Sequence, residues 1–211
     1  FFVALPIWFL VIKSFKSPDQ EISSPFSLSF PFFMENYKLA WLFVKDYILN
    51  TVIIAIGQTF GVLAVCSMAS YAFIRYNFPF KNVIFIIILS FMMVPGMLTL
   101  IPQYQMVMIA FNMKNSYLGV ILPAITGAVP MGIFLLKTFF SGLPKDLFEA
   151  AELDGASKFR QYLTIALPLS VPILATLAIT QVLAAWNDLL WPQLILQDEA
   201  MHTITVGLAP F

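Results

Sequence analysis

Long runs of apolar residues alternate with short polar segments along this chain. Runs without a charged side chain cover 47–74, 83–106 and 117–136, and a fourth run covers 170–195 with Asp188 near its far end. A helix needs about 20 apolar residues to cross the hydrocarbon core of a bilayer. The runs are continuous rather than alternating, and a helix satisfies its own backbone hydrogen bonds in lipid. Each run therefore predicts a membrane-spanning helix.

The two ends of the chain carry shorter apolar runs, at 1–12 and 203–211. The first run could also be the core of a signal peptide, but no basic segment precedes it and no small-residue cleavage site follows it. We interpret both runs as truncated spanning helices, because each is too short for a full crossing. The prediction is a single all-α transmembrane domain over 1–211, with six transmembrane helices of which the first and last are incomplete.

Composition agrees with this interpretation and excludes several classes of protein. Hydrophobic residues make up 60% of the chain and charged residues 10%, whereas soluble proteins have about 25% charged residues. Eleven Lys and Arg residues balance eleven Asp and Glu residues, so no net positive field would attract nucleic acid. Cys66 is the single cysteine and lies in an apolar run, where a thiol acts as a small hydrophobic group. We expect an integral membrane protein without a nucleic-acid partner or a metal site.

Small residues and prolines predict how the helices pack and bend. Gly57 and Gly61 form a GxxxG pair, and a second stripe of small residues has four-residue spacing, at Ala124, Ala128 and Gly132. Such residues allow helices to approach closely, and we favour packing within the chain over a dimer contact. The Pro95-Gly96 pair interrupts the run 83–106 and predicts a kink or a short unwound stretch there.

The segments that join the runs differ in character. Residues 13–46 form a long polar segment, 75–81 form a tight turn, and 137–168 contain a dense group of charged residues. Lys and Arg residues divide almost evenly between the two sides of the membrane, so the positive-inside rule does not orient the chain.

The charged segment has the pattern of a helix-turn-helix. Pro144 suits a first helical turn, and Asp146 favours the positive N-terminal end of a helix. Gly155 can adopt a left-handed conformation after the helix, and Ser157 can cap a second helix that runs towards Pro168. The second helix has apolar side chains near one face, which predicts that it lies on the membrane surface before the next span.

Here the sequence resembles a known family. Glu149-Ala150-Ala151, followed by Gly155 and then Ile165-x-Leu167-Pro168, is similar to the EAA signature of the permease subunits of binding-protein-dependent ABC importers. Chance agreement at this many fixed positions is rare. Further segments resemble the maltose-type (MalG-like) carbohydrate uptake branch of these permeases, at 71–79, 101–102, 115–119, 133–136 and 186–192.

The resemblance implies the type I ABC importer permease arrangement, in which the permease subunits form the pore and separate subunits hydrolyse ATP. In that family the signature helix is a coupling helix that docks on a cytoplasmic ATPase. The resemblance thus implies that 137–168 is a cytoplasmic coupling region, that 13–46 is extracytoplasmic, and that Glu149 pairs with an arginine of the ATPase. The alternative is a solvated amphipathic loop. The implied docking residues are Glu149, Ala150, Ala151, Asp154 and Gly155.

The same resemblance implies an assembly in a bacterial or archaeal cell (inner) membrane. The expected partners are a second homologous permease subunit, a dimer of ATP-binding cassette ATPases, an extracytoplasmic solute-binding protein, the sugar substrate and membrane lipid. We expect no cofactor on this chain, and ATP and Mg on the partner ATPase, because none of the nine glycines precedes a lysine as a Walker A loop requires. We expect no catalytic residue. A permease for a non-sugar solute and an ATP-independent secondary carrier remain alternatives, although few ionisable groups lie within the runs.

Polar residues in the apolar runs are candidates for a translocation path. These residues are Gln103, Gln181, Asn187 and Asp188. Polar side chains that only join helices are at least as common. For Asp188 we favour anchoring of the helix at the outer interface, with Trp186 and Trp191 as interfacial belt residues, over a role in the pore.

Overall fold

The computed structural model describes residues 4–209, and its regular elements over that range are all helical. These elements are α1 (Ala4–Ser14), α2 (Pro18–Ser23), α3 (Glu35–Arg75), α4 (Lys81–Ser90), the 3₁₀ turn η1 (Phe91–Met93), α5 (Gly96–Gln105), the π-helical η2 (Met106–Ala110), α6 (Tyr117–Ser141), α7 (Lys145–Leu153), α8 (Lys158–Gln161), the π-helical η3 (Tyr162–Ala166), α9 (Leu167–Leu169), α10 (Val171–Asn187), α11 (Leu190–Ile195), the 3₁₀ turn η4 (Glu199–Met201) and α12 (Ile204–Leu208). The predicted all-α class is confirmed.

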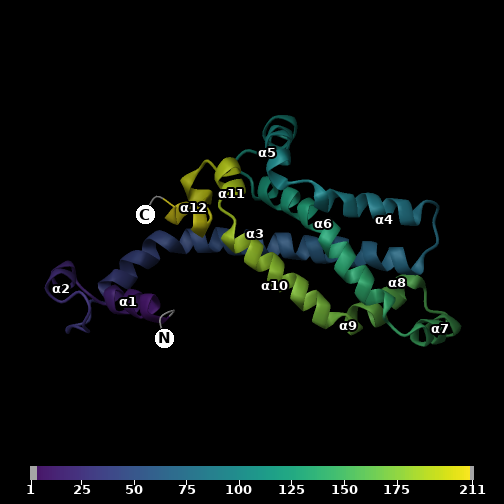
Figure 1. Ribbon diagram of the computed structural model, residues 1–211, viewed down its shortest axis with the longest axis horizontal. Coiled ribbons are helices and arrows are strands. Elements are labelled where there is room, and N and C mark those ends of the chain that lie inside the picture. Colours follow the sequence, from purple (N-terminus) through teal and green to yellow (C-terminus); the bar gives the residue numbers. More distant parts are fainter. Residues whose placement is uncertain (1–3, 210–211) are drawn as a thin grey trace.

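Helix α3 is the central element of the structure. Its 41 residues extend about 60 Å at 1.5 Å per residue, and α6 and α10 pack along it (Figure 1). Three clusters of buried side chains follow one another along this helix, around Ile54, around Val62 and Cys66, and around Tyr71. Apolar burial along α3 therefore connects one end of the molecule to the other.

Small residues bring α3 and α6 close together. A Cβ atom on Gly57 would lie 2.8 Å from Cδ1 of Ile121, and one on Gly61 would clash with Ile125. A Cβ atom on Gly132 would lie 2.5 Å from Sγ of Cys66. The GxxxG pair therefore packs within the chain, as the sequence predicted, because a larger side chain would force the helices apart.

Two helices, α3 and α6, are long and apolar enough to cross a membrane by themselves. Two further spans result if each bent pair counts as one crossing: α4–η1 with α5–η2, bent by 99°, and α8–η3–α9 with α10, bent by 76°. The first bend follows the predicted break at Pro95-Gly96. The count of six crossings stays a prediction, because the predicted spans 1–12 and 203–211 include residues 1–3 and 210–211, which lie outside the described residues.

The N-terminal part of the chain forms a small module at one end of α3 (Figure 1). Helix α2 begins with a capping box at Ser17, and Lys13 pairs with Glu21 at 2.9 Å. The Asn36 amide donates hydrogen bonds to the carbonyls of Ser14 and Lys16, at and just after the end of α1, which ties the module to the first turn of α3. The polar segment 13–46 is thus partly helical, since it contains α2 and the first turns of α3, where Glu35 has the sign that favours a helix N-terminus.

Candidate functional site

The charged segment folds as the helix-turn-helix that its sequence predicted. Helix α7 follows Pro144 and has Asp146 in its first turn. Gly155 has φ of +76°, and the N–H of Ala156 donates to the carbonyl of Ala151 at 2.9 Å, which closes the C-terminal end of α7. The hydroxyl of Ser157 then accepts a hydrogen bond from the Arg160 N–H at 3.3 Å. No atom lies within 4 Å of a Cβ atom on Gly155, so its conformation rather than lack of space requires a glycine.

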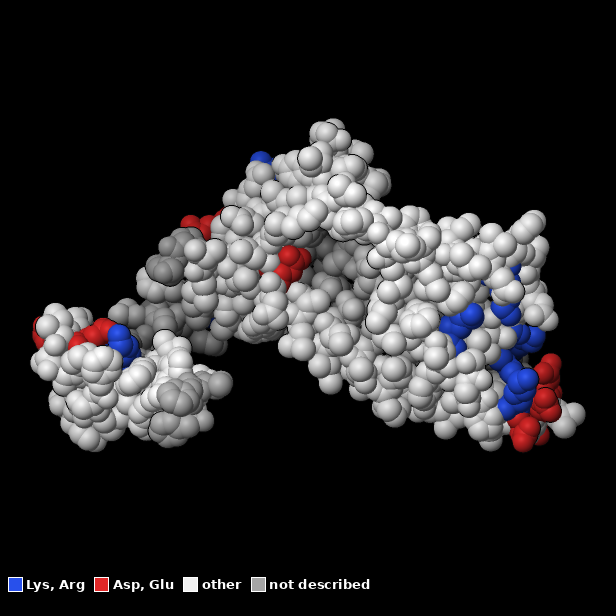
Figure 2. Space-filling view, viewed as in Figure 1, with Lys and Arg blue, Asp and Glu red and all other residues white. Residues whose placement is uncertain are grey.

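The predicted docking residues lie together on α7 and the turn after it. Glu149, Ala150, Asp154 and Gly155 are exposed, and Ala151 is half-buried. Figure 2 shows acidic side chains at this extremity of the molecule, beside a group of basic ones. The carboxylates are therefore accessible to another protein, as a docking helix requires.

The opposite face of α7 is anchored on the end of α3 by one aromatic ring. Phe148 is 4% exposed, and the guanidinium of Arg75 lies 4.1 Å from the centre of its ring. The side chain of Tyr71 packs in the same cluster. An aromatic ring buried beneath a cation combines apolar burial with a cation–π attraction. Helix α7 is therefore held at the last turn of α3.

Hydrogen bonds join the second half of the hairpin to the same end of α3. The Tyr71 hydroxyl donates to the carbonyl of Lys158 at 2.9 Å, and the Arg75 guanidinium donates to Oε1 of Gln161 at 3.4 Å. Gln161 is 1% exposed and also donates to the carbonyl of Ala156 at 3.0 Å. The hydroxyls of Ser67 and Tyr162 lie 2.7 Å apart. Sequence reasoning did not identify this network, although a lone phenylalanine among the carboxylates of α7 was a signal for its anchor.

The second half of the hairpin is the second helix that the sequence predicted, with a π-helical stretch in its middle. It consists of α8, the π-helical η3 and α9, and it bends by 76° into α10. Tyr162 and Ala166 are buried, whereas Phe159 and Leu163 are exposed. The predicted apolar face is therefore divided, because one pair of residues four apart packs inward and the other faces outward.

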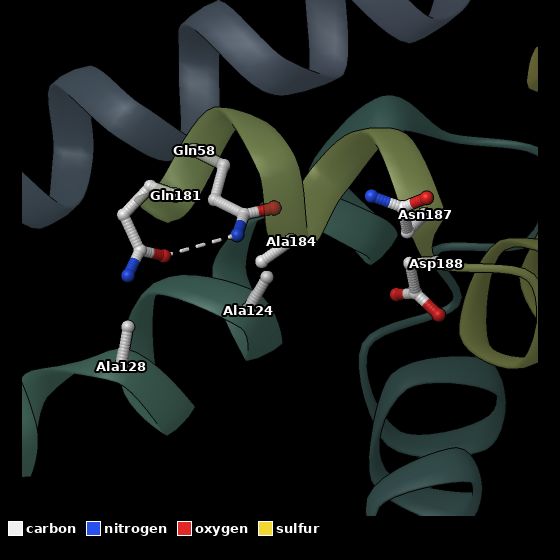
Figure 3. Close-up of a pocket in the computed structure, with 7 residues that line it drawn as sticks. All are labelled: Gln58, Ala124, Ala128, Gln181, Ala184, Asn187 and Asp188. Atoms are coloured by element: carbon white, nitrogen blue, oxygen red, sulfur yellow. Dashed lines mark hydrogen bonds between the residues drawn. The ribbon is translucent and has the colours of Figure 1, made fainter. Parts of the chain in front are cut away.

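An open cavity of about 450 Å³, with amide, carboxyl and alanine side chains in its lining, lies between α3, α6 and α10. Figure 3 shows its lining residues, which are Gln58, Ala124, Ala128, Gln181, Ala184, Asn187 and Asp188. The amide of Gln58 is 6% exposed and donates from Nε2 to Oε1 of Gln181 at 3.2 Å. Three small alanine side chains leave the space open between the polar groups.

The far side of the cavity is the break between α10 and α11. Asn187 ends α10 and donates from Nδ2 to the carbonyl of Leu183 at 2.7 Å, and the Asp188 carboxylate accepts from the Trp191 N–H at 3.4 Å. Trp191 is 8% exposed and donates from its indole to the carbonyl of Gly119. Our prediction of Trp191 as a belt residue is therefore wrong, because the ring is packed against α6.

The structure brings together three of the four residues that the sequence marked as a translocation path. Gln181, Asn187 and Asp188 line the cavity, whereas Gln103 lies on α5 and is not part of the lining. Gln58 lines the cavity and was missed. A glutamine in the middle of the apolar run 47–74 was the available signal, because an amide in a span needs a polar partner or a polar space.

Comparison with known proteins identifies the family. Residues 64–208 match the model of the family described as binding-protein-dependent transport system inner membrane component. The chain belongs to this family. The permease protein NgcG of the diacetylchitobiose uptake system of Streptomyces coelicolor shares 33% identity over 211 residues, which cover 99% of this chain and 70% of that protein. The permease protein AraQ of the arabinooligosaccharide transport system of Halalkalibacterium halodurans shares 34% identity, with coverage of 99% and 76%.

A solved structure supports the fold. A bacterial ABC transporter involved in the import of the acidic polysaccharide alginate contains a chain with a TM-score of 0.85 and 21% identity, matched over 99% of this chain and 74% of that one. The family match confirms the resemblance that the EAA signature carried, and the two oligosaccharide permeases confirm the resemblance of the other segments to carbohydrate ABC importer permeases. The protein is accordingly an integral membrane permease subunit with the ABC importer permease fold.

Proposed function

We propose that this permease is the transmembrane pore subunit of an ATP-driven sugar importer in a bacterial or archaeal cell (inner) membrane. It pairs with a second, related permease and receives its substrate from an extracytoplasmic solute-binding protein. A dimer of ATP-binding cassette ATPases binds ATP and Mg and supplies the energy, and this chain performs no catalysis. The sugar class is supported by the names of two relatives, which transport diacetylchitobiose and arabinooligosaccharides.

The observation that carries the proposal is that one helix joins the exposed signature hairpin to the polar cavity. Arg75 of α3 holds Phe148 of α7, and Gln58 of the same helix lines the cavity. The two residues are 17 positions apart in an unbroken helix, a distance of about 25 Å. A displacement of α7 is thus transmitted to the cavity through a rigid element, as alternating access requires.

In this mechanism α7 faces the cytoplasm and docks on the ATPase. Glu149 forms an ion pair with an ATPase arginine, and Ala150 and Ala151 allow close approach because their side chains are small. Asp154 and Gly155 form the turn that directs the chain back to α3. Closure of the ATPase dimer draws the α7 helices of the two permeases together, and α3 and α10 then change the side from which the cavity is open.

The direct test is uptake of a labelled neutral disaccharide by proteoliposomes that contain the complete complex and its binding protein. We expect uptake to require ATP, and we expect Glu149→Ala to lower it by about tenfold, since one charge-assisted pair is lost. Glu152→Ala on the same exposed helix is the matched control and should retain uptake. Uptake without ATP would instead indicate a secondary carrier, and ATP-driven uptake of a non-sugar solute alone would reject the sugar assignment.

A further inference from the structure

The cavity between α3, α6 and α10 presents both hydrogen-bond acceptors and donors to its interior. Oε1 of Gln58 and Oδ1 of Asn187 have no hydrogen-bond partner among the described residues, and neither does Nε2 of Gln181. The Asp188 carboxylate accepts from Trp191 and retains further acceptor positions, since a carboxylate offers about four. The Gln58 side chain is 6% exposed, and its Oε1 remains accessible to a molecule in the cavity. These free acceptors and donors can therefore serve a polar ligand.

The charge of the lining restricts which polar ligand fits. Asp188 is the charged side chain among the lining residues, and none of these residues is basic. In Figure 2 the hollow on this face contains acidic atoms, while the Lys and Arg side chains drawn on the face lie away from it. Repulsion between like charges is strong where the surroundings have a low dielectric constant. An anionic ligand would therefore lack a partner and face a carboxylate.

We propose that this cavity binds a neutral sugar unit through its hydroxyl groups and disfavours anionic sugars. A hydroxyl group donates one hydrogen bond and accepts others, so one sugar hydroxyl can donate to Oε1 of Gln58 and accept from Nε2 of Gln181, and a second hydroxyl can donate to the Asp188 carboxylate. The volume of about 450 Å³ lies within the range of small-molecule sites. Gln58 and Gln181 hold the hydroxyls, and Asp188 selects against negative charge. The inference rests on the proposed function and names the substrate class of its pore.

Equilibrium binding to the intact permease–ATPase complex in nanodiscs, without nucleotide or binding protein, tests the assignment. The two probes are disaccharides of similar size, neutral N,N′-diacetylchitobiose and anionic digalacturonate, and saturation-transfer NMR measures both affinities. We expect the wild-type complex to bind the neutral sugar about tenfold or more tightly than the anionic one. Asp188→Asn should reduce this preference mainly by improving digalacturonate binding, because the amide keeps the acceptor for Trp191 without the charge.

The amide pair has its own variant and control. Gln58→Leu should weaken binding of the neutral sugar about tenfold, because the hydrogen bond from the sugar hydroxyl to Oε1 of Gln58 is lost. Gln193→Leu, which removes an exposed amide from α11 outside the lining, should leave both affinities unchanged. Melting temperatures of the variant complexes near the wild-type value show that the fold is retained, and a second substitution, Gln181→Leu, repeats the test if Gln58→Leu lowers stability.

The possible failures differ in what they reject. The cavity assignment is overturned if the wild-type complex binds neither sugar or binds both equally. It is also overturned if Gln58→Leu, Gln181→Leu and Asp188→Asn all leave the affinity for the neutral sugar unchanged. The last outcome would place the site on the partner permease. The proposed function fails on a different measurement, the dependence of uptake on ATP, which this equilibrium experiment does not use.

Discussion

The signature hairpin and the polar cavity are two polar regions of a mostly apolar molecule, and they are built differently. The hairpin is continuous in sequence, from α7 to α9, and its key residues lie within a few positions of one another. The cavity collects single residues from three helices, as Gln58 of α3 and Gln181 of α10 illustrate. A contiguous motif is visible in a sequence, whereas a site assembled across helices depends on how those helices pack.

The two regions also differ in the contacts that maintain their structure. Phe148 seats the hairpin through burial and a cation above its ring, so the contact is strong and local. The cavity is kept open by the absence of bulk at Ala124, Ala128 and Ala184. Changes in the hairpin are therefore expected to affect the coupling of ATP hydrolysis to transport, and changes in the cavity are expected to affect the binding and uptake of the solute.

Removing the anchor of the hairpin should have the largest effect. Phe148→Ala deletes a buried ring and should cost about 3 kcal/mol of local stability, so α7 separates from Arg75 and ATP-driven uptake falls close to background. Sugar-stimulated ATP hydrolysis measures the coupling. Phe159→Ala removes an exposed ring from the same hairpin and should retain at least most of the stimulation. Full stimulation in Phe148→Ala would show that the anchor does not transmit motion.

Changing the turn should have the next largest effect. Gly155→Val places a β-branched side chain at a φ of +76°, which costs about 1–2 kcal/mol per residue in the left-handed region. We expect a complex that still assembles but loses substrate-stimulated ATP hydrolysis. Gly155→Asn should preserve more of the stimulation, because asparagine tolerates this conformation. Assembly is checked by co-purification, and unchanged stimulation in Gly155→Val would contradict a role for the turn.

Filling the cavity should lower sugar uptake by a smaller factor and leave basal ATP hydrolysis unchanged. Ala184→Leu adds bulk to the lining and should lower sugar uptake about tenfold, as a few methylene groups do in a binding pocket. ATP hydrolysis in the absence of substrate should stay at the wild-type rate, because the hairpin is untouched. Val182→Leu adds volume to α10 outside the lining and serves as the control. Equal uptake by Ala184→Leu and wild type would exclude the cavity from the route.

The smallest effect is expected on α5. Gln103→Leu removes an amide that the sequence suggested for the path but that the structure leaves outside the cavity. Uptake should change less than twofold, within the small effects typical of surface substitutions. Initial uptake rates of Gln103→Leu and Gln181→Leu, measured side by side, would test the assignment. A loss as large as that of Gln181→Leu would extend the route to α5.

Much of the helical organisation was predictable from the sequence. The apolar runs marked α3 and α6, the Pro95-Gly96 pair marked the bend, and the glycine pair on α3 marked close packing. The first helix of the hairpin was predictable from Pro144 before it and Gly155 after it, since backbone conformation determines where both ends lie. The second helix was also predictable and covers 158–169, but its apolar face was not, because packing of Tyr162 on α3 divides that face.

The amino-acid sequence alone determined the class of the molecule, its helices and its signature hairpin, because hydropathy, caps and turns act over a few neighbouring residues. Tertiary structure decided which polar residues meet: Gln58 joins Gln181, Gln103 stays outside the cavity, and Trp191 faces α6 instead of lipid. The physical reason is that side-chain partners within a membrane protein depend on the rotation and crossing of helices. The rotation and crossing of the helices depend on close packing between residues far apart in the chain.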